Sequence, residues 1–424
     1  MTALLLVLFA ILILVGAPIA IGLVGASLVA MLQFDISISM MPYNIYSSIA
    51  KFLLLAIPFF VLAGNIMEKV GISQKLIDLA KVLVGHRRGG MAIVCVGVSC
   101  FFAAISGSGP ATVAALGLIV IPAMIKSGYN EGTSAALMAT AGSIGLIIPP
   151  SISYILYSSI TGVSTGKLFI AGFIPGILMG TALVIATMIV SSKQKLTVMP
   201  RASNRDMWIA FKDAFWGLMM PVIILGGIYG GIFTATEAAA VSAVYGLIVG
   251  VFVYRTLTFK SFYEILAKSA RQTGAILLTV AMASLFSYVV TVGGIADRAI
   301  TSLTNISAGN PVIFLLIANV VLLIAGCFVD GNSGFYIFTP LLYPVARSLG
   351  YDPIAFGIVM TMNLAIGLVT PPVGLNLYVA SGVSGVSLSD TIRHVWPFVI
   401  ASTLVLLIVT YFPSVYMWLP QMMK

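Results

Sequence analysis

Residues 145–151 read Gly-Leu-Ile-Ile-Pro-Pro-Ser, and residues 367–373 repeat the pattern as Gly-Leu-Val-Thr-Pro-Pro-Val. Each stretch lies inside a hydrophobic run, and its proline pair cannot continue a helix. The second proline has no N–H group to donate, and it pushes the first proline out of helical geometry. We therefore predict that one helix is interrupted at Pro149-Pro150 and another at Pro371-Pro372.

The two interruptions belong to a repeat with an offset of 222 residues, because other motifs keep the same spacing. The matching pairs are Pro122 and Pro344, Gly128-Tyr129 and Gly350-Tyr351, and Ser108-Gly109 and Asp330-Gly331. Chance does not explain so many glycines and prolines in one register. The chain therefore consists of two related halves, as in transporters that are built from internal repeats.

The composition places most of the chain in a lipid bilayer. Of the 424 residues, 60% are hydrophobic and 8% are charged, and the mean hydropathy is +1.14. Soluble domains carry about 25% charged residues, and a soluble core cannot absorb this much apolar surface. Apolar runs long enough to span a bilayer core recur along the chain. The sequence therefore predicts an all-α polytopic membrane protein.

Neither the net charge nor the cysteines indicate another class of protein. The net charge of +9 comes from short clusters of Lys and Arg, which act as topology signals, so we expect no nucleic-acid partner. Cys95, Cys100 and Cys327 stand in apolar surroundings without metal-ligand spacing, which favours packing over metal or disulfide chemistry. Residues 2–32 lack the basic start of a signal peptide, so we predict a retained membrane segment that is broken near Gly16.

Two of the longer apolar segments carry a polar, glycine-rich cluster in the middle. Residues 106–110 (Ser-Gly-Ser-Gly-Pro) interrupt one segment, and residues 330–334 (Asp-Gly-Asn-Ser-Gly) interrupt another. Each cluster is predicted to be the tip of a re-entrant helical hairpin, so each half contains one hairpin and one discontinuous helix. The apolar segments are 2–32, 50–68, 90–125, 133–161, 168–191, 207–232, 235–254, 273–295, 311–345, 353–383 and 395–419.

The basic residues predict that the two halves have opposite orientations. The loop after segment 50–68 carries five Lys and Arg residues between positions 69 and 88 and should be cytoplasmic. Its counterpart in the second half, a loop at about 296–310, has only Arg298 and should be external. The basic stretches 193–212 and 255–271 are also predicted to be cytoplasmic. The repeats would then be inverted, which makes two access states nearly symmetric.

Four helix interruptions that meet near the middle of the bilayer would create a polar cavity, because lipid cannot satisfy their free backbone groups. Exposed carbonyls and the hydroxyls of Ser106, Ser108 and Thr370 are hard oxygen ligands suited to sodium ions. The N-termini of the half-helices offer N–H groups to an anion. A simple kink explains any single interruption, but it does not explain four interruptions at one offset.

Asp330 is the only acid between about Val312 and Leu342, and a buried charge has either a partner or a role. Two roles remain open for it, namely direct binding of an ion or substrate and capping of a helix N-terminus. Lys and Arg are scarce in the predicted membrane interior, so sodium and helix dipoles should balance an anionic substrate. The residues predicted to contact substrate are Ser108, Ser151, Ser153, Asp330, Asn332, Ser333 and Asn376.

Two other functions compete with a sodium-driven transporter of a small organic anion. An intramembrane serine enzyme, suggested by residues 104–107, would need a base, yet His86 and His394 stand beside basic or interfacial segments and the sequence has no HExxH motif. An ion channel would pass ions without substrate. Strict dependence of ion flux on substrate would separate the transporter from the channel.

At these motifs the sequence resembles the large membrane subunit of the tripartite ATP-independent periplasmic (TRAP) transporters, the DctM-like family, over essentially its whole length. The matching residues are 57–65, 106–112, 145–151, 330–332 and 367–373. The resemblance implies a multi-pass protein of the bacterial inner membrane with an elevator mechanism. It also implies sodium-coupled uptake of a carboxylate of the C4-dicarboxylate or sialic acid type. The implied partners are a separate small four-helix membrane subunit and a periplasmic substrate-binding protein.

The resemblance also implies where the ions bind and how the chain divides. One sodium site would lie between Ser106-Gly107-Ser108 and residues from Gly142 to Pro149. The second would lie between Gly326-Cys327 and residues from Thr370 to Pro372. The implied parts are scaffold helices at 1–70, a cytoplasmic interfacial helix and loop at 71–89, the first hairpin and broken helix of the transport domain at 90–165, scaffold helices and loops at 166–272, a scaffold helix and external arm at 273–310, the second hairpin and broken helix at 311–390, and a C-terminal scaffold helix at 391–424.

Overall fold

A computed structural model describes residues 2–422, which form helices and connecting segments and no strand. Seven helices in this range are long and apolar enough to cross a bilayer. The α-helices are α1 (Thr2–Leu14), α2 (Ile19–Gln33), α3 (Met40–Ile49), α4 (Ala56–Lys69), α5 (Ile72–Val84), α6 (Gly90–Ser106), α7 (Gly109–Lys126), α8 (Glu131–Ser143), α9 (Ile152–Thr161), α10 (Thr165–Val190), α11 (Asn204–Tyr229), α12 (Ala235–Ile248), α13 (Phe259–Val292), α14 (Ile295–Ile306), α15 (Pro311–Gly326), α16 (Gly331–Ser348), α17 (Pro353–Gly367), α18 (Leu375–Ser384), α19 (Leu388–Tyr411) and α20 (Ser414–Gln421). Three short helices of other types are η1 (Phe52–Leu55), η2 (Ile144–Leu146) and η3 (Val249–Val253).

All four predicted interruptions are present. Residues 107–108 between α6 and α7 fall inside the first glycine-rich cluster. Residues 327–330 between α15 and α16 end at Asp330, the first residue of the second cluster, and residues 331–334 already form the first turn of α16. Neither proline pair is helical, and both pairs are joined by a cis peptide bond. The break predicted near Gly16 is confirmed as well, because α1 ends before it and α2 starts after Pro18. Glycine and proline therefore end these helices where their backbone chemistry requires it.

Two stretches are more helical than the sequence analysis expects. α13 begins at Phe259 with a capping box made by Thr258 and Ser261, so most of the basic stretch 255–271 is the first part of a long helix. Residues 296–310 are mainly α14 and not the expected loop. Ile300 and Leu303 of α14 are spaced for one helical face and pack against the core. This spacing makes a helix where a loop was expected from the position of the segment in the repeat; the low charge predicted only that the segment is external.

The amphipathic pattern at 73–85 predicts a helix, and α5 is that helix. Ile72, Leu76 and Leu79 are buried, and α5 packs against α6 and α11. Its apolar face therefore contacts protein. A position at the membrane interface remains a prediction.

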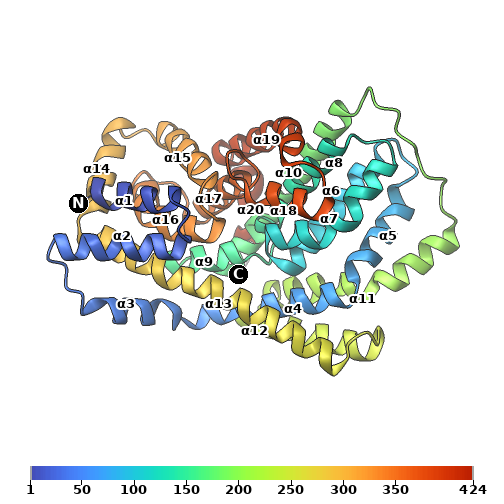
Figure 1. Cartoon of the computed structure of the whole chain (residues 1–424), viewed down its shortest axis with the longest axis horizontal. Coiled ribbons are helices and arrows are strands. Elements are labelled where there is room, and N and C mark those ends of the chain that lie inside the picture. The colour runs from blue at the N-terminus through green and yellow to red at the C-terminus, as the bar shows by residue number, and fades with distance from the viewer. Residues whose placement is uncertain (1, 423–424) are drawn as a thin grey trace.

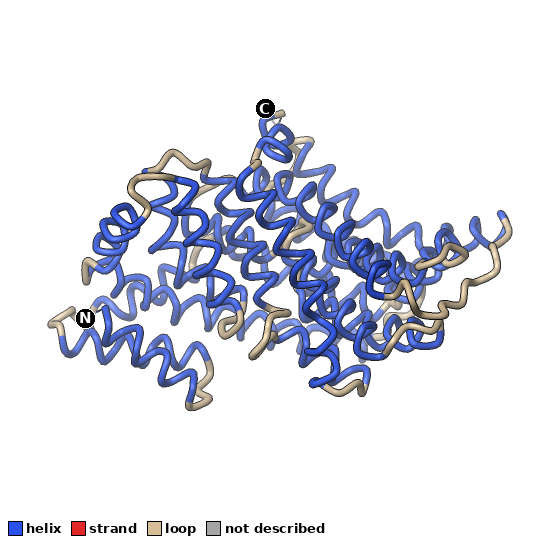
Figure 2. Tube along the Cα trace, turned by 90° about the horizontal axis from the view of Figure 1, so that it is seen from above, coloured by secondary structure: helices blue, strands red, loops and turns tan. Residues whose placement is uncertain are grey.

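The helices form two groups that meet around the four interruptions (Figure 1). In one group, α13 packs along α2, α3 and α4, while α4 packs on α12 and α12 contacts α11. In the other group, α7 and α8 pack with α18 and α19, and α15 packs with α16 and α17. α10 packs mainly on α19, α20 and α6 and only slightly on α11. Figure 2 shows that residues 191–203, which connect α10 to α11, run outside the bundle. The domain boundaries implied by the elevator scheme remain predictions.

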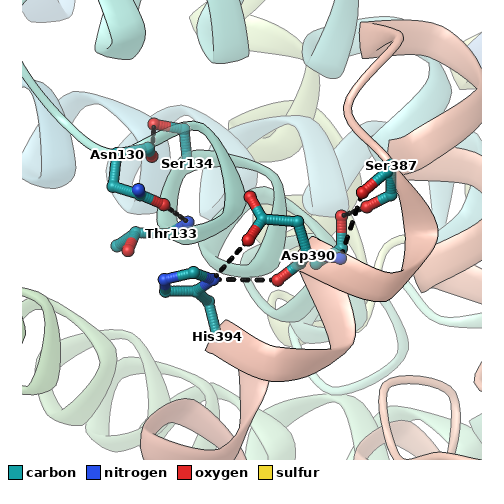
Figure 3. Close-up of polar contacts among 7 residues, drawn as sticks. Asn130, Thr133, Ser134, Ser387, Asp390 and His394 are labelled. Carbon is teal, nitrogen blue, oxygen red and sulfur yellow. Dashed lines mark hydrogen bonds and ion pairs between the residues drawn. The ribbon is translucent and has the colours of Figure 1, made fainter.

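The contact between α8 and α19 shows how closely the second group is packed (Figure 3). His394 Nδ1 lies 3.2 Å from a carboxylate oxygen of Asp390 and 2.9 Å from the backbone oxygen of the same residue. A Cβ atom at Gly132, in the first turn of α8, would collide with both side chains. The start of α8 therefore lies directly on this pair and requires glycine.

Candidate functional site

A cavity of about 290 Å³ lies where the four interruptions meet. The first half contributes Ser106, Gly107, Ser108, Leu146, Ile152 and Ser153 to its wall. The second half contributes Asp330, Gly331, Asn332, Leu368 and Leu375. Leu146 and Leu368 are equivalent positions of the 222-residue repeat. The remaining wall comes mainly from α4 and α13, so both groups of helices meet at the cavity.

The turn between α6 and α7 packs directly against the first proline-pair break. A Cβ atom on Gly145 would lie 3.0 Å from the carbonyl oxygen of Ser108, and one on Gly107 would lie 3.0 Å from the carbonyl oxygen of Pro150. A Cβ on Gly142 would collide with Val113 of α7. The structure therefore brings together the two stretches between which the first sodium site is predicted.

Three oxygen atoms converge within this turn. The hydroxyl oxygens of Ser106 and Thr112 lie 2.9 Å apart. Both hydroxyls donate to the carbonyl oxygen of Ser108, at 3.3 Å from Ser106 and 2.8 Å from Thr112. Thr112 is not among the predicted ligands, although it lies in the glycine-rich motif. Hydroxyl and carbonyl oxygens are the donor set that suits sodium.

In the second half, α15 and α17 approach each other through two glycines. A Cβ on Gly326 would lie 3.0 Å from the Cα atom of Gly367, and one on Gly367 would lie 2.7 Å from the carbonyl oxygen of Gly326. Cys327 and Thr370 each donate to a carbonyl of their own preceding turn, at 3.2 and 2.8 Å. The residues predicted for the second sodium site thus surround a close crossing of backbones, with Pro372 in the adjoining break.

The two halves interlock at the bottom of the site. Asn376 is fully buried, and its side-chain nitrogen donates to the carbonyl oxygen of Ala139 in the other half at 3.1 Å. The side chain of Leu146 lies between the first residues of α7 and α16, within 2.9 Å of a Cβ placed at Gly109 and 3.0 Å of one placed at Gly331. Asn376 therefore joins the halves and does not line the cavity.

Asp330 caps α16 and also faces the cavity. Its carboxylate accepts from the backbone N–H groups of Asn332 and Ser333, at 3.0 and 3.3 Å, and from the hydroxyl of Ser333. Ser333 is fully buried in this contact. Among the predicted substrate ligands, Ser108, Ser153, Asp330 and Asn332 line the cavity, whereas Ser151, Ser333 and Asn376 lie behind its wall.

Four helices begin at the interruptions, and their first turns surround the cavity. These helices are α7, α9, α16 and α18. α7, α9 and α18 receive no side-chain cap, although Ser108 and Ser151 stand at two of the cap positions. The Ser151 hydroxyl donates instead to the carbonyl oxygen of Leu146 at 2.6 Å. Uncapped N-terminal N–H groups and the positive end of the helix dipole favour an anion.

The sequence analysis missed the polar face that α4 and α13 present to the cavity. The side-chain nitrogen of Asn65 donates to Ser269 at 2.9 Å and to Gln272 at 2.7 Å. One turn further along, Glu68 pairs with Lys268 at 2.9 Å. Asn65 lies in a motif that carries the family resemblance, but its partners are more than 200 residues away. Nothing in the sequence pattern indicates this pairing.

Comparisons with known proteins identify the family of this chain. The family model described as "Tripartite ATP-independent periplasmic transporter, DctM component" matches residues 6–415. The C4-dicarboxylate TRAP transporter large permease protein DctM of Pseudomonas aeruginosa is 44% identical and covers 95% of this chain and 93% of its own length. The isethionate permease DctMQ of Oleidesulfovibrio alaskensis is 43% identical over 97% of this chain and 65% of its own length. The sialic acid permease SiaM of Vibrio cholerae is 36% identical over 96% and 95%.

Solved structures share the fold at low sequence identity. The Alcanivorax borkumensis YdaH transporter matches with a TM-score of 0.64 and 13% identity, covering 91% of this chain and 89% of its own. Neisseria gonorrhoeae MtrF matches with a TM-score of 0.60 and 13% identity, covering 95% and 94%. At this identity the likeness concerns the fold alone.

Proposed function

This chain belongs to the DctM component family of the tripartite ATP-independent periplasmic transporters, and from that premise we propose that it drives uptake of a small organic anion by symport with sodium. Membership makes it a multi-pass protein of the bacterial inner membrane and a transporter permease without catalytic activity. The family resemblance stated for the sequence is thereby confirmed, and the enzyme alternative is excluded.

The observation that carries the proposal is the set of helix N-termini around one cavity. α7 and α9 turn uncapped first turns toward it, and each is a ready site for a negative group. A small carboxylate bound there accepts hydrogen bonds from N–H groups that otherwise have to donate to water. At α18 the N–H groups of Asn376 and Leu377 already donate to the carbonyl oxygens of Leu368 and Gly374. The cavity volume of about 290 Å³ suits a small solute.

Charge in the cavity wall supports coupling to a cation. Among the described residues that line the cavity, Glu68 and Asp330 are acids and none is basic. Glu68 is paired with Lys268, so Asp330 is the acid that repels an incoming carboxylate by like charge until a cation is bound nearby. The oxygen cluster of Ser106, Thr112 and Ser108 and the Gly326–Gly367 crossing are the proposed places for sodium. Each sodium ion that moves inward gains about 2.3 kcal/mol per 100 mV of membrane potential.

We further propose that the two halves are inverted repeats and that the α6–α7 and α15–α16 pairs are re-entrant hairpins. The 222-residue register supports the repeat, and the glycine-rich turns at the cavity support the hairpins. In this scheme the interrupted helices form a transport domain that slides as an elevator against α4, α13 and their neighbours. Two halves that are inverted relative to one another make the inward-open and outward-open states of such a transporter nearly equivalent.

The substrate class is proposed from the relatives. Relatives named for C4-dicarboxylates are 38–44% identical, one named for isethionate is 43% identical, and one named for sialic acid is 36% identical. Among carboxylates we therefore propose a C4-dicarboxylate first and sialic acid second. The proposed partners are a small four-helix membrane subunit and a periplasmic substrate-binding protein. The relative named DctMQ, of which this chain spans 65%, supports the small subunit.

Reconstitution tests the function. The chain, the small subunit and the binding protein are placed in liposomes, and uptake of labelled C4-dicarboxylate and sialic acid is measured with and without an inward sodium gradient. We expect uptake to need all three proteins and to stop without sodium. Robust uptake by this chain alone, with no cation gradient, contradicts the proposal, and so does sodium current in the absence of substrate.

A matched pair of threonines tests the first sodium site. Thr112 and Thr181 each donate to the carbonyl four residues earlier, at 2.8 and 2.9 Å, but only Thr112 adjoins the oxygen cluster. Thr112→Val should raise the sodium concentration for half-maximal uptake about ten-fold, since one ligand contact to a charged group is worth about 1.5 kcal/mol. Thr181→Val should leave it unchanged. If both variants have the same sodium concentration for half-maximal uptake, Thr112 is not a sodium ligand.

A further inference from the structure

A second cavity lies away from the transport site, between α5, α6 and α11. Its volume is about 680 Å³, and we call it the lateral groove. Nearly every side chain that lines it is apolar, with Asn204 as the polar exception among the described residues. Large apolar side chains at its edge are exposed, including Leu83 at 48%, Phe101 at 50% and Trp208 at 66%. In a membrane protein such a surface contacts hydrocarbon and not water.

The floor of the lateral groove is open down to the backbone of α6. Gly97 lines the groove, and a Cβ atom placed on it would meet no atom within 4 Å. Ile93 and Phe101, one turn to either side, complete the floor. An empty apolar channel of this depth fits a flexible acyl chain, because methylene groups can fill it without any hydrogen bond.

Basic residues stand beside one wall of the groove. Arg205 and Lys212 lie three residues before and four residues after Trp208 on α11, so the three share one side of the helix. The acids of this region, Asp78, Asp206 and Asp213, line a different and smaller cavity. Arg205 and Lys212 lie on the side of Trp208 away from the groove-lining Met207 and Phe211, so positive charge borders the groove at its Trp208 edge. The sequence predicts that this end of α11 is cytoplasmic.

We propose that the lateral groove binds an anionic phospholipid of the cytoplasmic leaflet, with an acyl chain over Gly97 and its phosphate at Arg205 and Lys212. Basic sites between membrane helices on the cytoplasmic side are suited to anionic headgroups. Trp208 lies between the two bases, where an amphipathic ring bridges chain and headgroup. The lipid contacts α6 on one side and the α5–α11 pair on the other.

Trp208 itself reports on the bound lipid. The sequence has four tryptophans, and replacing Trp216, Trp396 and Trp418 by phenylalanine leaves Trp208 as the only one. The full chain is reconstituted in liposomes that contain phosphatidylglycerol or phosphatidylcholine with brominated acyl chains, which quench tryptophan on contact. We expect half-maximal quenching at a mole fraction of brominated phosphatidylglycerol at least ten-fold below that of brominated phosphatidylcholine, since each base near the surface favours an anionic lipid about five-fold.

Two sets of variants separate the chain site from the headgroup site. Arg205→Gln with Lys212→Gln should bring the two quenching midpoints together. Gly97→Leu fills the groove and should lower the maximal quenching, whereas Gly274→Leu, on α13 with equally open space at its Cβ, should not. Equal midpoints for both lipids in the protein with intact bases overturn the proposal. Equal maximal quenching in Gly97→Leu and Gly274→Leu also overturns it. So does a loss of quenching when the small membrane subunit is added, because a protein helix then occupies the groove.

Discussion

Replacing Gly367 by alanine should disable the second proposed sodium site through a single methyl group. The new Cβ would lie 2.7 Å from the carbonyl oxygen of Gly326 and closer still to its carbon atoms, whereas ordinary contacts begin at 3.4 Å. The crossing backbones would have to separate by about 0.7 Å or more. Overpacking of this kind costs about 3 kcal/mol, which outweighs the roughly 1 kcal/mol gained when alanine replaces glycine in a helix.

The cost appears as lost sodium affinity. If the tight crossing is needed for binding, the net destabilisation of about 2 kcal/mol lowers the competent fraction about thirty-fold, and the apparent sodium affinity falls by the same factor. The assay is the sodium concentration for half-maximal substrate uptake in the reconstituted three-protein system. Gly326→Ala, whose nearest contact is 3.0 Å, should cause a smaller loss, and Gly274→Ala, with no atom within 4 Å, should cause none. Equal sodium dependence of Gly367→Ala and Gly274→Ala would refute this reasoning.

Three further perturbations follow from single contacts. Lys51 donates to the carbonyl oxygen of Ser159 at 2.5 Å at the C-terminal end of α9, so Lys51→Met should speed amide exchange there about ten-fold. Because burial lowers the pKa of Lys51, the difference in exchange rate between the native protein and Lys51→Met should shrink as pH rises, at a lower pH than for an exposed lysine; a difference that stays constant through the alkaline range argues against it. Asn376→Leu leaves the buried carbonyl of Ala139 without its donor and should destabilise the protein by about 1–3 kcal/mol, seen as a lower Tm. Gly132→Val should separate α8 from α19 at a cost of about 1–3 kcal/mol, and an unchanged Tm shows that α19 can shift.

The helix interruptions could be predicted from the sequence because their causes are local. A proline removes a donor and glycine-rich turns relax the backbone within a few residues, so the pattern at 145–151 and 367–373 indicates breaks without knowledge of the fold. The register of 222 residues then groups the breaks into two pairs. α14 is a different case, since its helical spacing was present in the sequence but the segment was taken as a loop from its position in the repeat.

The contacts that complete the site could not be predicted, because they join residues far apart in the chain. Asn376 meets Ala139 across 237 positions, and Asn65 meets Gln272 across 207. A buried amide can donate to any of many backbone carbonyls, so its partner cannot be identified until the fold is known. For the same reason, the sequence could not show that Ser333 and Asn376 point into the protein while Ser153 lines the cavity.

The two halves share the 222-residue register of motifs but not the same chemistry, and we propose that this difference lets one cavity hold ions of opposite sign. Ser108 and Asp330 are equivalent positions and both stand at helix N-caps. The Asp330 carboxylate already accepts from the first N–H groups of α16, so that N-terminus is compensated and its surplus acceptor capacity favours a cation. The Ser108 side chain leaves α7 uncapped, so that N-terminus favours an anion. We propose that the Ser-to-Asp difference directs the carboxylate to the uncapped N-terminus of α7, next to the sodium ion proposed at Ser106, Ser108 and Thr112, and keeps it away from Asp330.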